Sequence, residues 1–258
     1  ARHLVAHRYD ALHCNELDSW LIGCAIKLIY RRTKVVFDVH ECYLDRLQDR
    51  GWSKASSAMA RRGLRWLIRL LSWGTDHVIL AKDGAAEDFR GIEAVPRTKV
   101  RNYVSVRLLE EEDASASAVD GQLGLPAGAT CVHSGLFSVI RGWPQVVDAF
   151  GILTSRLVEA NLLVMGSVND GTVSELEQRV QASGFSGRYR RLDWLGSTEA
   201  FSLLRQCDIG LVTFQPGPVN HLYALPHKVF DYMLAGLAVI VPTFAREVAP
   251  MVENARCG

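Results

Sequence analysis

The sequence lacks an excess of charge of one sign, and it lacks a long hydrophobic run. Its 29 Lys and Arg residues nearly balance its 28 Asp and Glu residues, which leaves a formal net charge of +1. This balance gives no overall attraction to nucleic acid, so we expect no nucleic-acid partner. No apolar stretch reaches the ~18–20 residues that span a bilayer, and no signal-peptide pattern is visible. The 48% of hydrophobic residues are ordinary for a soluble globular protein.

Metal-binding motifs are also lacking. The six cysteines are scattered, with no Cys-x-x-Cys pair or Cys/His cluster, and no Asp-x-Asp motif stands in a suitable place. We therefore expect no metal requirement. Several cysteines lie in apolar runs, where a free thiol behaves as a small buried hydrophobe. This pattern favours a reducing, cytoplasmic location over a disulfide framework.

Short apolar runs alternate with segments of helical period along most of the chain. In the first half we expect strands at residues 11–14, 34–39, 76–81 and 99–103, with helices at 16–30 and 84–89. In the second half we expect strands at residues 130–134, 161–165, 191–195, 208–213 and 238–241, with helices at 143–155, 173–183, 198–206, 227–235 and 245–253. Strand–helix alternation in both halves predicts an α/β fold of two Rossmann-like, doubly wound parallel-sheet lobes.

The stretch Leu109–Gly128 is rich in Glu, Ala, Ser and Gly and is typical of a connection between lobes. We place the first lobe at residues 1–105 and the second at 106–258. Parallel sheets bind ligands at the carboxyl ends of their strands, so two facing lobes would enclose a cleft.

The segment from Ala224 to Ile240, ALPHKVFDYMLAGLAVI, is the most informative. Pro226 fits a helix start, where its missing N–H costs nothing. His227 and Lys228 then lie in the first turn, beside free N–H groups and the positive end of the helix dipole, and this favours an anion. Asp231 lies one turn further on, where its carboxylate could accept hydrogen bonds from the two hydroxyl groups of a ribose. A solvated ion pair of Lys228 with Asp231 is the simpler alternative.

This segment resembles the donor-site motif of GT-B fold glycosyltransferases, in particular the large retaining family 4. The family commonly carries a Glu-x7-Glu pattern; Asp231 takes the second acidic position, whereas Tyr223 stands at the first. Residues 134–143, SGLFSVIRGW, are similar to the family's glycine-rich opening of the second lobe. The resemblance implies that Gly135, Gly142 and Arg141 meet a diphosphate, although Leu136 replaces an arginine common in the family.

The first lobe resembles the acceptor side of the same family. Residues 9–18 and 35–41 match its acceptor-side strands, and His40 matches a histidine that often lies near the transferred sugar. The family's first strand, its glycine loop and its closing helix are not in the sequence. By this comparison the chain is an internal fragment, with an incomplete first lobe and a missing C-terminal end.

The segment Met59–Trp73 carries arginines at helical spacing. A basic amphipathic helix with tryptophan at its edge can lie on an anionic membrane. The alternative is a helix packed on the sheet, with arginine stems covering apolar surface. A membrane contact would place the protein at the inner face of the membrane.

The resemblance implies a glycosyltransferase that moves a sugar from a nucleotide-diphosphate donor, UDP- or GDP-linked, to a hydroxyl of a glycan or lipid-linked acceptor, with retention of configuration, as in polysaccharide biosynthesis. It implies catalytic roles for His40, Arg141 and Lys228, and donor binding by Gly135, Gly142, Pro226, His227, Lys228 and Asp231. Two alternatives stay open: a sugar-nucleotide epimerase of the same fold, and a degenerate nucleotide-binding lobe.

Overall fold

The chain folds into two compact units, which we describe separately. The computed structural model describes residues 7–47, 53–101, 103–104, 106, 123–168 and 173–258. The first unit comprises Ala1–Asn102 with Gly217–Ala224, and the second comprises Tyr103–Pro216 with Leu225–Gly258. Most of the connection predicted at Leu109–Gly128 lies outside the described residues.

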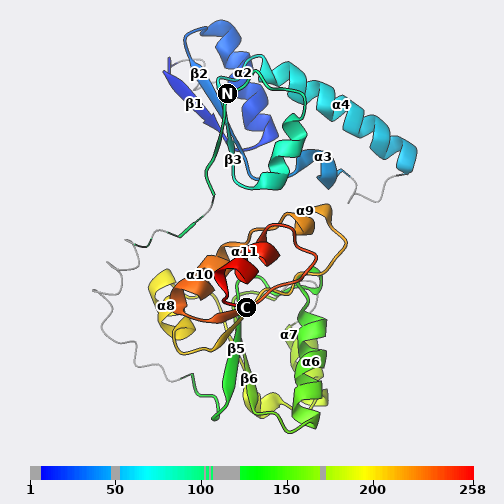
Figure 1. The fold of residues 1–258 in the computed structure, drawn as a ribbon, viewed down its shortest axis with the longest axis vertical. Helices are drawn as coiled ribbons and strands as arrows, with labels where there is room; N and C mark the ends of the chain where they lie inside the picture. Colours follow the sequence, from blue (N-terminus) through cyan, green and yellow to red (C-terminus); the bar gives the residue numbers. More distant parts are fainter. Residues whose placement is uncertain (1–6, 48–52, 102, 105, 107–122, 169–172) are drawn as a thin grey trace. The chain divides into compact units, whose positions relative to one another are not determined.

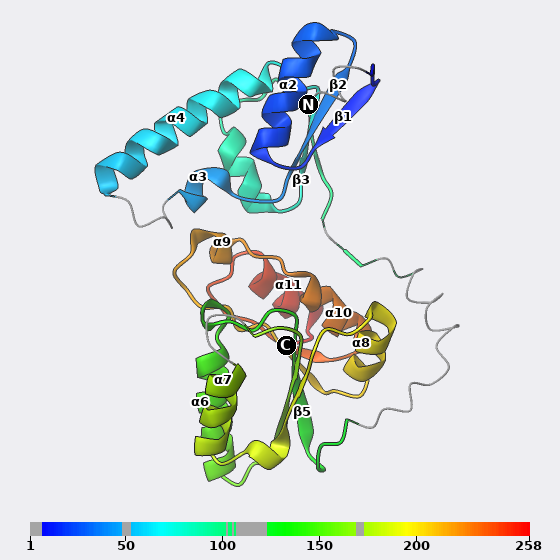
Figure 2. The same ribbon diagram turned by 180° about the vertical axis from the view of Figure 1, so that it is seen from behind.

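The first unit is built on a parallel sheet with strand order β1-β2-β3-β4. Its elements are β1 (Ala11–Cys14), α2 (Leu17–Ile29), β2 (Lys34–Val39), α3 (Tyr43–Arg46), α4 (Lys54–Ser72), β3 (His77–Leu80), the 3₁₀ helix η2 (Asp83–Phe89), β4 (Arg97–Lys99) and α9 (Val219–Leu222). Successive strands are added in one direction, so right-handed crossovers place the connecting helices on one face. Figures 1 and 2 show α2 and α4 together on that face.

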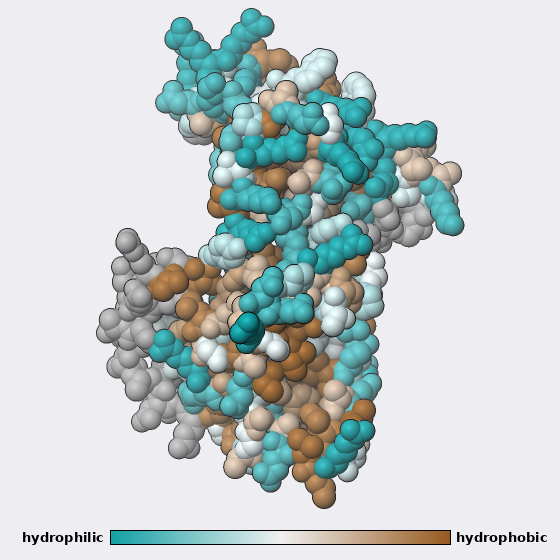
Figure 3. Space-filling model, in the orientation of Figure 1, coloured by the Kyte–Doolittle hydropathy of each residue, from teal (hydrophilic) through white to brown (hydrophobic). Residues whose placement is uncertain are grey.

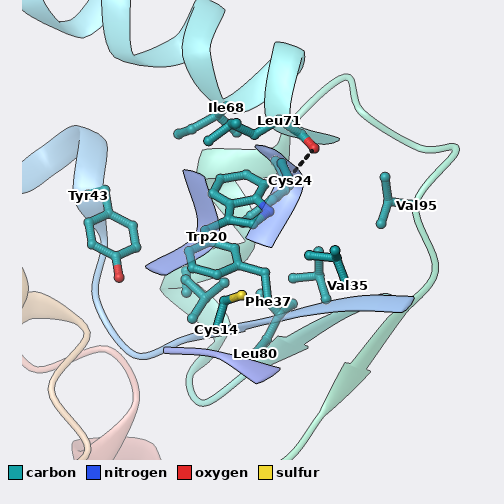
Figure 4. Packing of buried hydrophobic residues seen from close by; sticks show 14 of the residues in the cluster. Cys14, Trp20, Cys24, Val35, Phe37, Tyr43, Ile68, Leu71, Leu80 and Val95 are labelled. Atoms are coloured by element: carbon teal, nitrogen blue, oxygen red, sulfur yellow. Dashed lines mark hydrogen bonds between the residues drawn. The ribbon is translucent and has the colours of Figure 1, made fainter. Parts of the chain in front are cut away.

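The core of the first unit lies between this sheet and its helices. Trp20 of α2 stacks on Phe37 of β2 with ring centroids 4.0 Å apart, and its indole N–H donates to the Thr75 hydroxyl at 2.8 Å. Figure 4 shows the two rings at the centre of the cluster, with Leu71 of α4 above them. Alternation along β2 buries Phe37 and leaves Asp38 on the opposite, half-buried face. His40 follows at the carboxyl end of this strand.

The second unit contains a parallel sheet with strand order β7-β6-β5-β8-β9. Its elements are β5 (Ala129–Ser134), η3 (Val139–Arg141), α6 (Trp143–Ser155), β6 (Ala160–Met165), α7 (Val173–Ala182), η4 (Ser186–Arg188), β7 (Tyr189–Leu192), α8 (Ser197–Leu204), β8 (Ile209–Leu211), α10 (His227–Ala235), β9 (Ala238–Ile240) and α11 (Val248–Ala255). The order reverses between β5 and β8. Helices α6 and α7 therefore cover one face, and α8 and α10 cover the other (Figures 1 and 2).

The two parallel sheets confirm the predicted α/β fold class, and most elements lie where the sequence predicts them. The strand predicted at 191–195 lies instead at Tyr189–Leu192, because the apolar Trp194 that suggested a longer strand is 70% exposed. The strand predicted at 99–103 is Arg97–Lys99, in register with Val78–Leu80 of β3. The short helices α3 and α9 have too few residues for a periodic signal.

The surfaces of the two units differ in polarity. Figure 3 shows mostly hydrophilic residues over the visible face of the first unit, whereas the visible face of the second includes several hydrophobic areas. All six cysteines are free thiols. Among the described helices, none combines the length and the apolar content that a bilayer crossing requires.

Candidate active site

The reversal of strand order in the second unit brings together the segments predicted to bind the donor. Strand β5 ends at Ser134 and is followed directly by Gly135, and its neighbour β8 ends at Leu211. In open parallel sheets, ligands bind outside the carboxyl ends of the strands at such a switch point. Helix α10 begins at His227, with Pro226 as its N-cap residue. The candidate site therefore lies at a position that the topology itself favours.

Gly135 opens the turn at this edge of the sheet. Its φ angle of +91° lies in the left-handed region, which favours glycine, and its N–H donates to the Met165 carbonyl at 2.7 Å. A Cβ atom added there would meet only the Lys228 Nζ atom within 4 Å, at 4.0 Å. The missing side chain thus leaves the space in front of Lys228 open.

Lys228 points its side-chain nitrogen toward strand β5, where Nζ lies 2.9 Å from Nε2 of His133. Burial, and then the charge of Arg141, lower the pKa of Lys228 to about 7, while the charge of Asp231 opposes this shift. In the described residues no carboxylate forms an ion pair with Lys228. Lys228 is therefore a half-buried lysine without a counter-ion in the described part of the chain, which makes it a candidate for contact with an anion.

Arg141 and Asp231 lie close enough to Lys228 for their charges to act on its pKa. Arg141 ends η3, where its carbonyl accepts a hydrogen bond from the Thr213 hydroxyl at 2.9 Å. Asp231 is half-buried in α10; burial raises the pKa of its carboxyl, and the charges of His227 and Lys228 oppose that rise. His227 is exposed at the start of the helix. Two cations and one carboxylate thus converge without forming a closed ion-pair network.

Gly142 is explained by packing. It adopts φ +84° and is the N-cap residue of α6. A Cβ atom at this position would lie 2.2 Å from the Thr213 carbonyl oxygen, so the close approach of the two backbones requires glycine. Its predicted phosphate contact stays a prediction.

Tyr232, which the sequence analysis did not single out, fixes α10 to the turn. Its ring is fully buried against Gly210, where a Cβ atom would lie 2.2 Å from the ring. Its hydroxyl oxygen accepts a hydrogen bond from the Ser134 N–H at 2.8 Å and lies 3.1 Å from the Ser134 hydroxyl. A tyrosine one position after Asp231 thereby sets the spacing between the turn and the helix. His133 was missed as well; the signal was a histidine inside a strand that is buried along most of its length.

His40 lies in the first unit, at the carboxyl end of β2. Its Nε2 atom is 3.4 Å from one oxygen of Asp38, and Nε2 of His13 is 3.1 Å from the other. Asp38 therefore orients two histidines on one face of the sheet. The described residues contain no group of three or more His, Cys, Asp or Glu side chains that could hold a metal ion.

Comparison with known proteins now adds to this geometry. Residues 1–102 match the model of the glycosyl transferase 4-like domain. The chain has a GT-B fold. No curated protein matches the chain in sequence.

Solved structures with the same fold align with most of the chain. HepE from Anabaena, in a complex with UDP, aligns at a TM-score of 0.69 and 18% identity over 99% of this chain and 71% of its own. An α,α-trehalose-phosphate synthase from Burkholderia vietnamiensis aligns at 0.63 and 10% identity, covering 99% and 66%. WaaG, a glycosyltransferase of lipopolysaccharide biosynthesis, aligns at 0.59 and 12% identity, covering 93% and 68%. At such identities the likeness shows the fold alone.

Proposed function

We propose that the protein transfers a sugar from a nucleotide-diphosphate donor to a hydroxyl acceptor, with retention of configuration. The observation that carries the proposal is Lys228, which faces the open Gly135 turn without a carboxylate partner. Arg141 adds a second positive charge near it. Two cations at this point would stabilise the departing diphosphate, which is the main electrostatic task in such a transfer.

The other predicted residues receive complementary roles. Asp231 would accept hydrogen bonds from the ribose diol, because it is half-buried one turn along the same helix. The backbone at Gly135 would approach the phosphates, and the helix start at Pro226 and His227 would face them. His40, oriented by Asp38, would act on the acceptor side. We propose UDP as the first base to test, because HepE was solved with UDP and with UDP-glucose.

Thermal unfolding with a panel of UDP, GDP, UDP-glucose and GDP-mannose tests the donor site. A nucleotide at 100 times its dissociation constant should raise the free energy of unfolding by about 2.7 kcal/mol. Asp231→Ala should abolish that gain. Asp148→Ala, which removes an exposed carboxylate of the same unit, should leave it unchanged. A folded chain that no nucleotide stabilises would refute the donor site.

Product analysis separates transfer from epimerisation. A transferase consumes the nucleotide-sugar and releases the nucleoside diphosphate only as glycosylated acceptor accumulates, whereas an epimerase releases nucleotide or free sugar without acceptor. A panel of glycan and lipid-linked hydroxyl acceptors would serve, in the longest form of the protein that can be produced. Nucleotide binding without turnover in any of these assays would identify a degenerate binding lobe.

We also propose that α4 contacts an anionic lipid surface, which would place the protein in the cytoplasm at the inner face of the membrane. The helix packs on the core through Ile68 and Leu71. It also carries a second, exposed stripe at helical spacing, comprising Met59, Trp66, Leu70 and Trp73. Trp66 is 66% exposed and Trp73 89%. Both alternatives drawn from the sequence thus find support, on opposite faces of one helix.

Charge favours a lipid surface as the partner of this stripe. The exposed residues Arg62, Arg65 and Arg69 follow one edge of the stripe, and none has a carboxylate partner among the described residues. Helix α4 itself contains no Asp or Glu. Tryptophan beside arginine suits the interface of an anionic bilayer, where each basic residue contributes about 1 kcal/mol.

Co-sedimentation with vesicles tests the lipid contact. The chain should bind vesicles of phosphatidylcholine with about 30 mol% phosphatidylglycerol, because the anionic lipid attracts the arginines. It should detach when salt screens this attraction. Replacing Arg62, Arg65 and Arg69 by Gln should weaken binding about 100-fold. Trp66→Ser with Trp73→Ser should weaken it on neutral and anionic vesicles, whereas Trp194→Ser in the other unit should not. Equal binding by all variants would refute the contact.

A further inference from the structure

Lys228 makes its closest polar contact with a buried histidine. His133 of β5 is 1% exposed, and its ring packs on Phe137 with centroids 4.3 Å apart. Its Nε2 atom lies 2.9 Å from Lys228 Nζ and 3.1 Å from the Leu136 carbonyl oxygen. Its Nδ1 atom is buried and has no hydrogen-bond partner in the described part of the chain.

These contacts cannot all be satisfied by one arrangement of protons. If the Lys228 ammonium donates to Nε2, then Nδ1 carries the ring proton and that N–H has no acceptor. If Nε2 carries the ring proton and donates to the Leu136 carbonyl, the Lys228 nitrogen can share that same hydrogen as a second acceptor only when its amine is neutral. The protonation state of Lys228 and the tautomer of His133 are therefore linked.

The charges around the pair favour the neutral amine in the absence of a ligand. Burial, and then the charge of Lys228, hold the pKa of His133 well below its ordinary value, with Arg141 acting in the same direction. Arg141 also lowers the pKa of Lys228, which is about 7, and Asp231 of the same helix only partly compensates. His227 acts on Asp231. Above pH 7 most molecules would thus hold an uncharged Lys228.

We propose that His133 is a positioning residue that holds the Lys228 amine against the Gly135 turn, and that an entering diphosphate binds the ammonium form and draws one proton from solvent. The balance is simple: the lysine amine and a solvent proton give the ammonium, and no covalent bond changes. The inference rests on the proposed donor site. Its consequence is that nucleotide affinity falls as pH rises, because the proton must be taken up at each binding event.

Isothermal titration calorimetry with UDP tests the proton uptake directly. Titrations at pH 8 in two buffers of different ionisation enthalpy, Tris and HEPES, give the number of protons bound per UDP. We expect uptake of close to one proton at pH 8. Uptake should decrease toward pH 6, where Lys228 is already charged and the partly protonated UDP can itself release a proton on binding. At pH 8 the phosphates of UDP are fully ionised, since their last pKa is about 6.

Variants at His133 separate positioning from simple packing. His133→Phe keeps the ring and its contact with Phe137 but removes the acceptor, and should weaken UDP binding about tenfold and change the proton count. His133→Gln retains an acceptor and should restore most of the affinity. If His133→Phe does not fold, the proton count of the unmodified chain and His133→Gln still decide the question.

The outcomes are distinguishable from those of the proposed function. A chain that binds UDP with no proton uptake at pH 8 overturns the inference and leaves the donor site intact. Equal affinity and equal proton count in His133→Phe also overturn it. A folded chain that binds neither UDP nor GDP refutes the donor site itself. Lys228→Met, which removes the titrating group, should bind UDP weakly with no proton uptake.

Discussion

The charged cluster around Asp76 in the first unit is paired within the chain, whereas the one around Lys228 in the second unit is not. In the first unit, Asp76 accepts hydrogen bonds from Lys27, from Lys34 at 3.0 Å and from the Val35 N–H at 2.8 Å. Burial alone would raise the pKa of Asp76, but these donors lower it. The carboxylate ties α2 to the edge of the sheet. Its charge is satisfied inside the chain and serves the fold.

Around Lys228 in the second unit, the charged side chains converge without forming ion pairs with one another. The charges of Arg141 and Asp231 act on the pKa of Lys228, and the charge of Lys228 acts on the pKa of Asp231, yet no ion pair joins any two of these residues in the described part of the chain. An unpaired, half-buried charge costs stability, and such a cost is retained where a ligand offsets it. The comparison teaches that pairing, more than the mere presence of charge, separates a structural cluster from a candidate site.

The largest expected effect comes from removing the unpaired lysine. Lys228→Met should weaken UDP binding about 100-fold, because a buried charge contact is worth about 2–5 kcal/mol. The same variant without ligand should gain about 1–2 kcal/mol at pH 7, since a desolvated cation is replaced by an apolar side chain. Urea unfolding and calorimetry measure the two effects.

The pH dependence of Lys228→Met sharpens this prediction. A lysine whose pKa is lowered in the folded state binds fewer protons than it does in the unfolded chain between pH 7 and its ordinary pKa of 10.5. The free energy of unfolding of the parent chain should therefore rise with pH across this window. The advantage of the variant should shrink accordingly. An advantage independent of pH would contradict the account.

Removing the paired carboxylate of Asp76 should lower stability and leave UDP binding unchanged, the reverse of what we expect for Lys228→Met. Asp76→Asn should lose about 2 kcal/mol of stability, because Lys27 and Lys34 lose a charged acceptor, and it should bind UDP as the parent chain does. Because the folded-state pKa of Asp76 is lowered, the difference should be present above pH 4 and disappear as pH falls below it. Asp148→Asn, which breaks an exposed pair with Arg179, should cost less than about 1 kcal/mol.

The sequence predicted the fold, whereas the roles of the candidate donor residues stay predictions and their contacts were not foreseen. Strand and helix periods carry the α/β alternation, and Pro226 and Gly236 mark the bounds of α10, which begins at His227 and ends at Ala235. The lack of an ion pair between Lys228 and a carboxylate in the described part of the chain can be read only from the three-dimensional structure. It arises because the reversed strand order brings β5, about 95 residues earlier, against the first turn of α10, and sequence spacing does not encode that contact.

His133 and Tyr232 are residues near the candidate site that the sequence did not single out. Both face the site from buried positions, where a sequence reader expects packing residues and sees no reason to single out one polar atom. The prediction for His40 rests on the family resemblance, and the structure adds its contact with Asp38. A histidine in a buried apolar strand and a tyrosine opposite a strand glycine are signals only once the topology is known.

Removing the hydrogen bond between the Ser134 N–H and the Tyr232 hydroxyl should have an intermediate effect on stability and UDP binding. Tyr232→Phe leaves the Ser134 N–H without its acceptor, and should cost about 1–3 kcal/mol of stability and weaken UDP binding a few-fold. Tyr189→Phe is a matched control, because the buried Tyr189 hydroxyl has no hydrogen-bond partner among the described residues. Removing that hydroxyl should be neutral or stabilising. Equal losses in both variants, measured by urea unfolding, would contradict a specific role for Tyr232.

The smallest expected effect concerns Asp88, the buried carboxyl of the first unit that has backbone rather than cationic donors. It accepts hydrogen bonds from the N–H groups of Tyr43 at 2.6 Å and Leu44 at 3.3 Å. Burial nevertheless raises its pKa to about 6. The folded chain therefore holds more protons than the unfolded chain between pH 4 and 6, and this group's contribution to stability decreases as pH rises through that window.

Asp88→Asn should remove this dependence while keeping one acceptor for the start of α3. The stability of the parent chain relative to the variant should fall by about 1–2 kcal/mol between pH 4 and 6, as measured by urea unfolding at three pH values. Asp10→Asn, which changes an exposed side chain, should track the parent chain throughout. A constant difference between parent and Asp88→Asn would mean that the backbone donors offset burial completely, and that carboxyls in the first unit are satisfied by amides as fully as by lysines.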